Sequence, residues 1–370
     1  VGNQEGLGYA NFIRRTRFSD IGITDNLTVT NSGTQFVGNN NEALQWESTL
    51  DVNVGVDFGF NNDRFNGSFN LYRKETTDLL LLSTLAAPQV PGIETIFQNL
   101  TDGKVVNQGV ELALNYDFVQ TEDFTFSSSF NVAYNHNEVL DTDRIIDTGP
   151  INGNGLTGAF AQRLQAGQPL FSFYMAEFTG FDENGNPTYV DVDGNGEGDP
   201  DADKKFVGED AQPDWTAGLS LNATYKNFDF AAYFNGQFGF SVYNATDNAF
   251  FNAGGITIAK NVTTDVLTSG EAPGSSVAVS TRFLEKGDFV RLQTLSVGYN
   301  VPMSGEGLFD SLRFSVTGQN VFLITGYSGL DPEVSTNTGS LNASNIPTAG
   351  IEYAAFPRPR TFTLGVNARF

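Results

Sequence analysis

The chain has 370 residues, a formal net charge of −23 at pH 7, 33 Phe, 12 Tyr, no Cys and a single His. The acidic balance argues against a nucleic-acid partner, because phosphate binding needs clustered Lys and Arg. The lack of Cys excludes disulfide scaffolds, thiolate zinc sites and cysteine nucleophiles. No run of about 18 apolar residues is present to form a transmembrane helix, so the abundant Phe must be buried or covered in another way.

The dominant sequence pattern is alternation of apolar and polar residues, which predicts β-strands. In residues 51–60, Val and Phe occupy every even position, and Asp, Asn and Gly occupy the odd ones. Similar stripes predict nine long strands, at about 43–59, 63–81, 107–119, 123–138, 213–226, 228–243, 287–302, 311–325 and 360–370. A strand of a membrane barrel needs about 9–11 residues to cross the bilayer. The alternative is a soluble all-β sandwich or β-helix, but strands of a sandwich average about 5–6 residues.

The two faces of these strands differ in the way a transmembrane antiparallel β-barrel requires. The polar faces suit a water-filled lumen, and the aromatic-rich apolar faces suit contact with outer-membrane lipid, with Trp46 and Trp215 near strand ends. We therefore predict an all-β fold of this class.

The connections alternate between short and long, as in outer-membrane barrels with short periplasmic turns and long extracellular loops. Long connections are predicted at 82–106, 139–212, 244–286 and 326–359. Placing the short turns in the periplasm puts the long loops outside the cell and the C-terminus in the periplasm. The predicted location is the bacterial outer membrane.

The strand count indicates a piece of a larger barrel. With nine antiparallel strands, the first and last run in the same direction and cannot pair to close the barrel. Residues 1–42 show no convincing strand and are expected to be an extracellular loop or incomplete upstream barrel segment, whereas 43–370 form the barrel strands and loops. The first residues show no secretion leader.

Six stretches resemble, in order, motifs of the SusC/RagA-type TonB-dependent outer-membrane transporters. They are 40–47 (NNEALQWE, without the family's Pro and Lys), 72–80 (YRKETTDLL), 106–112 (VNQGVEL), 289–299 (FVRLQTLSVGY), 318–334 (GQNVF followed by GLDPEV) and 357–365 (PRPRTFTLG). The resemblance implies the C-terminal part of a barrel of about 22 strands. It also implies a SusD-like surface lipoprotein over the loops, TonB–ExbBD acting through an N-terminal part, and an oligosaccharide or peptide substrate.

The acidic stretch 191–203 follows the start of an EF-hand-like loop, which predicts a possible Ca²⁺ site. Oxygen-bearing residues stand at its first, third, fifth and ninth positions and Gly196 at the sixth, but the twelfth is Ala202 rather than Glu. The predicted ligands are Asp191, Asp193, Asn195 and Asp199, with Asp201 or Asp203 completing the shell. The alternative is a solvated acidic loop without metal.

Other candidate residues are aromatic or titratable. Candidate contacts for a substrate or partner in the long loops are Phe171, Phe173, Tyr174, Phe250 and Phe251, which equally suit packing within the loops. Phe370 resembles the terminal aromatic of the barrel assembly signal, or is simply a lipid contact. A catalytic role is not expected for His136, which lacks an obvious partner, or for Asp331 and Glu333, which are expected in a loop turn.

Three functional hypotheses remain. The first is TonB-dependent import of an oligosaccharide or peptide, with this chain forming the C-terminal barrel wall and the loops. The second is a stand-alone outer-membrane barrel enzyme, which would need another strand and a catalytic constellation. The third is a structural or interaction barrel within a larger envelope assembly.

Overall fold

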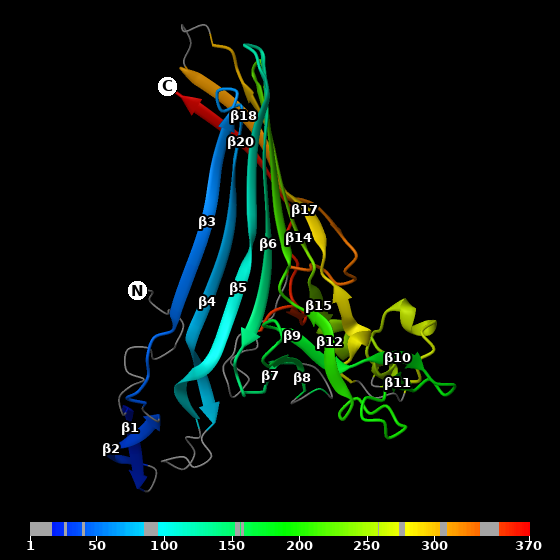
Figure 1. Cartoon of the computed structure of the whole chain (residues 1–370). Coiled ribbons are helices and arrows are strands. Elements are labelled where there is room, and N and C mark those ends of the chain that lie inside the picture. The colour runs from blue at the N-terminus through cyan, green and yellow to red at the C-terminus, as the bar shows by residue number, and fades with distance from the viewer. Residues whose placement is uncertain are drawn as a thin grey trace.

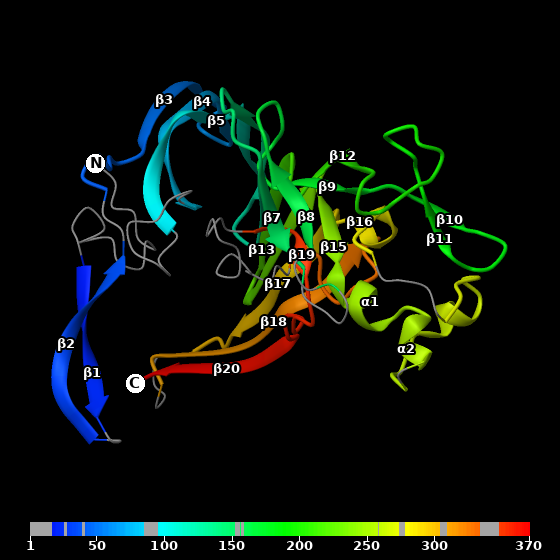
Figure 2. The same cartoon turned by 90° about the horizontal axis from the view of Figure 1, so that it is seen from below.

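The computed structural model describes residues 17–25, 28–38, 41–84, 95–151, 156, 159–257, 259–273, 278–303, 309–333 and 348–370. Its main element is one nine-stranded antiparallel sheet in which each strand pairs with the preceding and the following strand of the sheet (Figure 1). The strands are β3 (Ser48–Phe60), β4 (Phe65–Thr84), β5 (Thr95–Gln120), β6 (Phe124–Leu140), β13 (Trp215–Tyr225), β14 (Phe228–Phe238), β17 (Phe289–Asn300), β18 (Ser311–Thr325) and β20 (Thr361–Arg369). All nine predicted strands are therefore confirmed, and the sheet follows an arc when seen from below (Figure 2).

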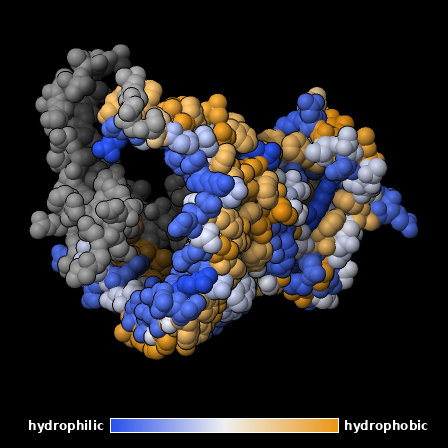
Figure 3. All heavy atoms as spheres, turned by 90° about the horizontal axis from the view of Figure 1, so that it is seen from above, coloured by the Kyte–Doolittle hydropathy of each residue, from blue (hydrophilic) through white to orange (hydrophobic). Residues whose placement is uncertain are grey.

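The strand register gives the sheet one apolar face, which we call the outer face. One row across it joins Val54, Leu71, Val110, Tyr134 and Trp215 on five successive strands of the sheet. These side chains are not buried by the chain: Val54 is 65% exposed and Trp215 44%. Hydrophobic residues accordingly line the outer rim of the curved sheet (Figure 3).

Short turns connect the strands at the end of the sheet where the C-terminus lies (Figure 1). The β3–β4 turn takes left-handed backbone conformations at Asn61, Asn62 and Asp63, a conformation that Asn and Asp tolerate better than most residues. The β13–β14 hairpin turns through Lys226 and Asn227, with Lys226 at a φ of 51°. The predicted alternation of short and long connections is thus seen in the structure.

The long connections at the opposite end fold together, and we call the described residues of 141–213, 239–288 and 326–360 the loop body. Its strands are β7 (Ile146–Pro150), β8 (Phe160–Leu164), β9 (Ser172–Ala176), β10 (Phe178–Phe181), β11 (Pro187–Tyr189), β12 (Lys204–Asp210), β15 (Ser241–Asn244), β16 (Leu284–Lys286) and β19 (Ile351–Glu352). Its helices are α1 (Ala245–Phe250) and α2 (Gly254–Thr257), with 3₁₀ turns at Thr264–Leu267 and Thr281–Phe283. In the part of the chain that the structure describes, no helix is both long and apolar enough to cross a membrane.

One hydrophobic core holds the three long connections together. Phe173 and Met175 from the first, Tyr243 and Phe283 from the second, and Ile351 from the third belong to the same buried cluster. Strand β15 pairs in parallel with β19 and antiparallel with β16, which adds backbone hydrogen bonds to this packing. The loop body is therefore a packed unit and not three independent loops.

Three segments differ from the sequence prediction. Residues 239–243, expected to continue the strand 228–243, leave the sheet: β14 ends at Phe238, Gly239 has a φ of 79°, and β15 pairs with β16 and β19 in the loop body. Residues 95–106, expected in a loop, continue β5, which pairs with β4 beyond a bulge between Thr77 and Leu79. In the segment 1–42, where no strand was expected, β1 (Arg17–Asp25) and β2 (Thr28–Gly38) pair with each other in a separate antiparallel sheet. The segments 95–106, β1 and β2 lack a strict apolar–polar alternation, so the sequence pattern did not indicate strands there. Residues 1–16, 85–94 and 334–347 of the predicted upstream segment and loops lie outside the described residues.

Candidate functional site

A buried ion cluster joins the loop body to the sheet. Arg291 on β17 is 1% exposed and lies 2.6 Å from Asp331, which is 2% exposed, and 3.0 Å from Glu333. Arg291 also donates a hydrogen bond to Asn320 Oδ1 at 2.5 Å, and Arg358 lies 3.2 Å from Glu333. Because removing one partner from such a cluster leaves a buried charge without compensation, these residues fix the 326–333 segment to the sheet wall.

The local backbone explains how the cluster is assembled. The β17–β18 pairing is interrupted by a bulge between Leu292 and Thr294, opposite Asn320, whose φ is 52°. The Asn320 side chain accepts from Arg291 and donates to the carbonyl of Arg358 at 2.7 Å. Described residues of three stretches that resembled family motifs, 289–299, 318–334 and 357–365, therefore meet in space at this cluster.

A second ion pair lies on the concave, inner face of the sheet. Asp229 on β14 and Arg313 on β18 are joined by two hydrogen bonds, at 3.1 and 2.5 Å, although β17 runs between them. At the crossing point β17 carries Gly298, where an added Cβ would collide with the Arg313 guanidinium and the Asp229 carboxylate. Gly298 thus leaves the space that this ion pair occupies.

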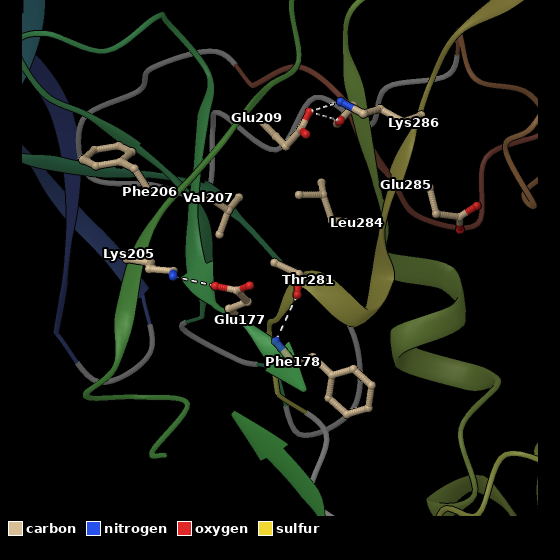
Figure 4. A pocket seen from close by; sticks show the side chains of 11 residues that line it. Glu177, Phe178, Lys205, Phe206, Val207, Glu209, Thr281, Leu284, Glu285 and Lys286 are labelled. Atoms are coloured by element: carbon tan, nitrogen blue, oxygen red, sulfur yellow. Dashed lines mark hydrogen bonds and ion pairs between the residues drawn. The ribbon is translucent and has the colours of Figure 1, made fainter. Parts of the chain in front are cut away.

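A cleft of about 390 Å³ opens in the loop body between β12 and the segment that ends in β16 (Figure 4). An ion pair lies at each of two sides: Glu177 with Lys205, and Glu209 with Lys286, both at 2.5 Å. Apolar side chains, among them Val207, Leu284 and Phe178, line the space between. Such partly exposed ion pairs contribute little stability, so their charged groups are available to a ligand.

The acidic loop 191–203 brings three carboxylates together. Asp191, Asp193 and Asp203 each offer a carboxylate oxygen within 4.8 Å of the others. Asp203 is fully buried and accepts hydrogen bonds from the backbone N–H groups of Asp199, Val192 and Asp193, at 2.7, 2.7 and 3.0 Å. These bonds, the one from Asp199 first, hold the pKa of the Asp203 carboxyl below its usual range.

The other two predicted ligands are placed differently. Asn195 Nδ2 donates to Asp193 at 3.1 Å, whereas Asp199 Oδ1 accepts from the backbone of Asp201 at 2.8 Å. Asp199 is not part of the carboxylate cluster, and Asp203, predicted only as a possible completing ligand, is its buried member. The two oxygens of Asp191 accept from the backbone of Gly194 and Gly196 at 2.7 and 2.8 Å.

The predicted aromatic contacts are divided between the core and the surface of the loop body. Phe173 is fully buried in the core, and Phe171 packs against it. The Tyr174 ring lies 3.6 Å from the Arg163 guanidinium carbon, and Phe250 stacks on Tyr353 with centroids 5.8 Å apart. Phe251, next to Phe250, is partly exposed. Tyr174, Phe250 and Phe251 therefore retain accessible surface, whereas Phe173 does not.

Phe370 and His136 lie on the sheet, outside the loop body. Phe370 follows the last strand, is 77% exposed and contacts Phe309 at a centroid distance of 5.0 Å. His136 on β6 has its Nε2 3.9 Å from Glu138. Neither the buried Arg291 cluster nor the Arg313 pair was identified from sequence, although an Arg inside an apolar strand is a signal for a buried partner.

Comparison with known proteins now decides the family. Residues 6–321 match the family described as "TonB dependent receptor-like, beta-barrel". The chain belongs to this family. Over 366 residues it is 32% identical to TonB-dependent receptor P3 of Formosa agariphila, with 89% of this chain and 35% of that protein covered. It is 30% identical to TonB-dependent receptor SusC of Bacteroides thetaiotaomicron, over 89% of this chain and 32% of that protein.

Solved structures show the same fold for this TonB-dependent receptor chain. The RagAB peptide importer in its open-open state matches 97% of this chain with a TM-score of 0.78 and 23% identity, covering 38% of that chain. The RagAB peptide transporter matches with a TM-score of 0.75. The predicted SusC/RagA resemblance and the antiparallel barrel fold are therefore confirmed. The chain spans about a third of the length of the curated relatives it matches, namely 35% and 32% of the two named above.

Proposed function

We propose that this chain forms the C-terminal barrel wall and the extracellular loops of a TonB-dependent nutrient importer of the bacterial outer membrane. The observation that carries the proposal is the outer face of the nine-stranded sheet. Its apolar side chains, such as Val54 at 65% and Leu364 at 82% exposure, run along the strands without cover from the chain. A continuous apolar face of this kind suits lipid, because in water it would be unstable.

The remainder of the importer would lie outside this chain. Strands β3 and β20, at the two edges of the sheet, run in the same direction and need further strands to close a barrel. The plug and the segment that TonB–ExbBD pulls on would belong to the same remainder. The names of the relatives, receptors and importers, support this function over that of a barrel enzyme.

The loop body is the proposed contact for a SusD-like surface lipoprotein and for substrate. A hydrophobic core holds its three connections together, and its cleft presents two ion pairs and apolar side chains. This mixture suits either an oligosaccharide or a peptide, because both combine polar groups with apolar surface. The structural similarity to RagAB, a peptide importer, supports a peptide, whereas the chemistry of the cleft accepts both.

We also propose that the loop at 191–203 binds Ca²⁺ through Asp191 and Asp193. The support is the grouping of these carboxylates with Asp203 and the choice of hard oxygen ligands. The bound ion would replace hydrogen bonds that Asp191 now accepts from Gly194 and Gly196. Its role would be to stiffen the acidic loop on the surface of the loop body.

The test of the import function uses the full-length protein in its own cell. A strain without the gene is compared with the same strain carrying the wild-type gene or a variant with Glu209→Gln and Lys286→Gln in the cleft. Uptake of labelled oligosaccharide and peptide mixtures is measured with and without a protonophore. Energy-dependent uptake that is restored by the wild-type gene and reduced by the cleft variant supports the proposal. Uptake that does not depend on the gene would favour the structural barrel instead.

A further inference from the structure

On the outer face of the described sheet, charged side chains occur at one place. Next to the row that ends in Tyr134 and Trp215, on the side of the loop body, a row joins Val52, Arg73, Gln108 and His136 across β3–β6. The row after it joins Leu50, Glu75, Val106 and Glu138, and the third brings Lys104 beside Thr77. Polar and charged side chains thus begin immediately beyond the row that ends in Tyr134 and Trp215, on the side of the loop body.

Arg73 and Lys104 are the Lys and Arg residues that the described strands place on this face. On the nine strands of the described sheet, Lys and Arg occur at Arg73, Lys74, Lys104, Arg291, Arg313 and Arg369. The register places Arg73 and Lys104 on the outer face and the other four on the inner face. The chain has a net charge of −23, yet two cations on neighbouring strands point outward where the apolar part of the outer face ends, on the side of the loop body.

The geometry around the two cations leaves them accessible. Glu75 lies between them, 3.6 Å from Arg73 Nη2 and 3.3 Å from Lys104 Nζ, and Arg73 Nη1 donates to Gln108 at 2.6 Å. Their side chains are 47% and 39% exposed, and Lys104 is a further 3.9 Å from Asp141. The ion pairs with Glu75, at 3.6 and 3.3 Å, are longer than charge-assisted hydrogen bonds. A phosphate is therefore able to replace Glu75 as the partner of the guanidinium and ammonium groups.

We infer that Arg73 and Lys104 form a binding site for the phosphorylated headgroup of an outer-leaflet glycolipid. The inference rests on the proposed function, which places the apolar face in the outer membrane with the loop body outside the cell. Tyr and Trp gather at the boundary between hydrocarbon and headgroups, and the row that ends in Tyr134 and Trp215 lies next to the charged rows. The charged rows are therefore at headgroup level. Phosphate is the anion that this level of a membrane offers, and Arg with Lys is a pairing suited to it.

The test measures glycolipid bound to the delipidated full-length protein in detergent, by native mass spectrometry. The probes are bis-phosphorylated lipid A and the same glycolipid after enzymatic dephosphorylation. The double variant Arg73→Gln with Lys104→Gln is compared with Lys74→Gln, a control on the same strand but on the inner face, where Lys74 lies 3.8 Å from Asp51. We expect the double variant to bind the phosphorylated lipid roughly tenfold more weakly and the control to bind it as the wild type does.

Equal binding of the two lipids by the wild type, or equal loss in the control, would overturn the inference. Reconstitution of the same proteins into bilayer nanodiscs separates this failure from failure of the proposed function. Wild type and variants that enter nanodiscs normally but lack phosphate preference contradict only the headgroup site. A wild-type protein that does not enter nanodiscs contradicts the barrel assignment itself.

Discussion

The guanidinium of Arg291 lies 2.6 Å from the carboxylate of Asp331, and both side chains are withdrawn from solvent. The pair joins the middle of the sheet wall to the segment that leads from β18 into the loop body. Movement of this segment relative to the wall would expose or separate two charges. The ion cluster therefore adds to the apolar contacts that hold the loop body on the sheet, such as Phe240 and Tyr327 packed against Phe289.

Arg291→Met is expected to destabilise the full-length protein by about 3–5 kcal/mol, because the buried carboxylate of Asp331 would lose its cation, whereas Glu333 keeps Arg358. The urea midpoint of the purified protein measures the effect. Arg358→Gln serves as the matched control, since Arg358 belongs to the same cluster but is 48% exposed, and its loss should cost less than about 1 kcal/mol. Similar midpoints for the two variants would show that the buried cluster does not fix the loop body.

Gly298→Ala is expected to break the Asp229–Arg313 pair, because its Cβ would occupy the space of both charged groups. The cost should be about 1–3 kcal/mol, the usual range for overpacking. Gly326→Ala is the control, since nothing lies within 4 Å of the Cβ it adds. If both variants keep wild-type heat stability in semi-native electrophoresis, the ion pair is able to move aside without cost.

Asp247 in α1 gives a pH-dependent prediction. Burial, together with the carboxylates of Glu285, Glu352 and Asp265, raises the pKa of Asp247 from 3.8 to about 6. The folded state therefore binds this proton more tightly than the unfolded state. The resulting stability is fully present below about pH 4 and is lost as the pH rises through about 6.

Asp247→Asn should consequently stabilise the loop body at pH 7.5 by about 1–2 kcal/mol, after allowance for solvent screening, and should have no such effect at pH 4. Hydrogen exchange of the 241–257 segment at both pH values measures the difference. Glu183→Gln, a change of an exposed carboxylate in the loop body that does not act on the pKa of Asp247, is the control. A gain in protection that is equal at both pH values would contradict the assigned titration.

The acidic loop predicts a response to metal. Addition of Ca²⁺ to the metal-free full-length protein should slow hydrogen exchange at residues 191–203, and Asp191→Asn with Asp193→Asn should abolish the response. Asp182→Asn is the control, because Asp182 caps the separate turn at Asn184 and Asn186. No change in exchange on adding Ca²⁺ at millimolar concentration would leave the loop as a hydrogen-bonded turn without metal.

The strands were predictable because lipid on one side and water on the other impose a strict alternation, visible in residues 51–60. The strands of the loop body could not be predicted in this way, because they pack on each other and lack that alternation. The Arg291 cluster could not be assembled from sequence, because its partners Asn320 and Asp331 are 29 and 40 residues away. In the acidic loop, Asp203 rather than Asp199 joins the carboxylate group because three backbone N–H groups position it.

The most direct test of the central claim asks which face of the sheet meets lipid. Single cysteines are introduced into the full-length protein at the outer positions Val54 and Leu364 and at the inner positions Asn53 and Thr363, spin-labelled, and examined in outer-membrane lipid. We predict that the outer labels are accessible to oxygen and shielded from a water-soluble nickel relaxant, and that the inner labels show the reverse. Equal access of the nickel relaxant to both faces would contradict a membrane-embedded barrel wall.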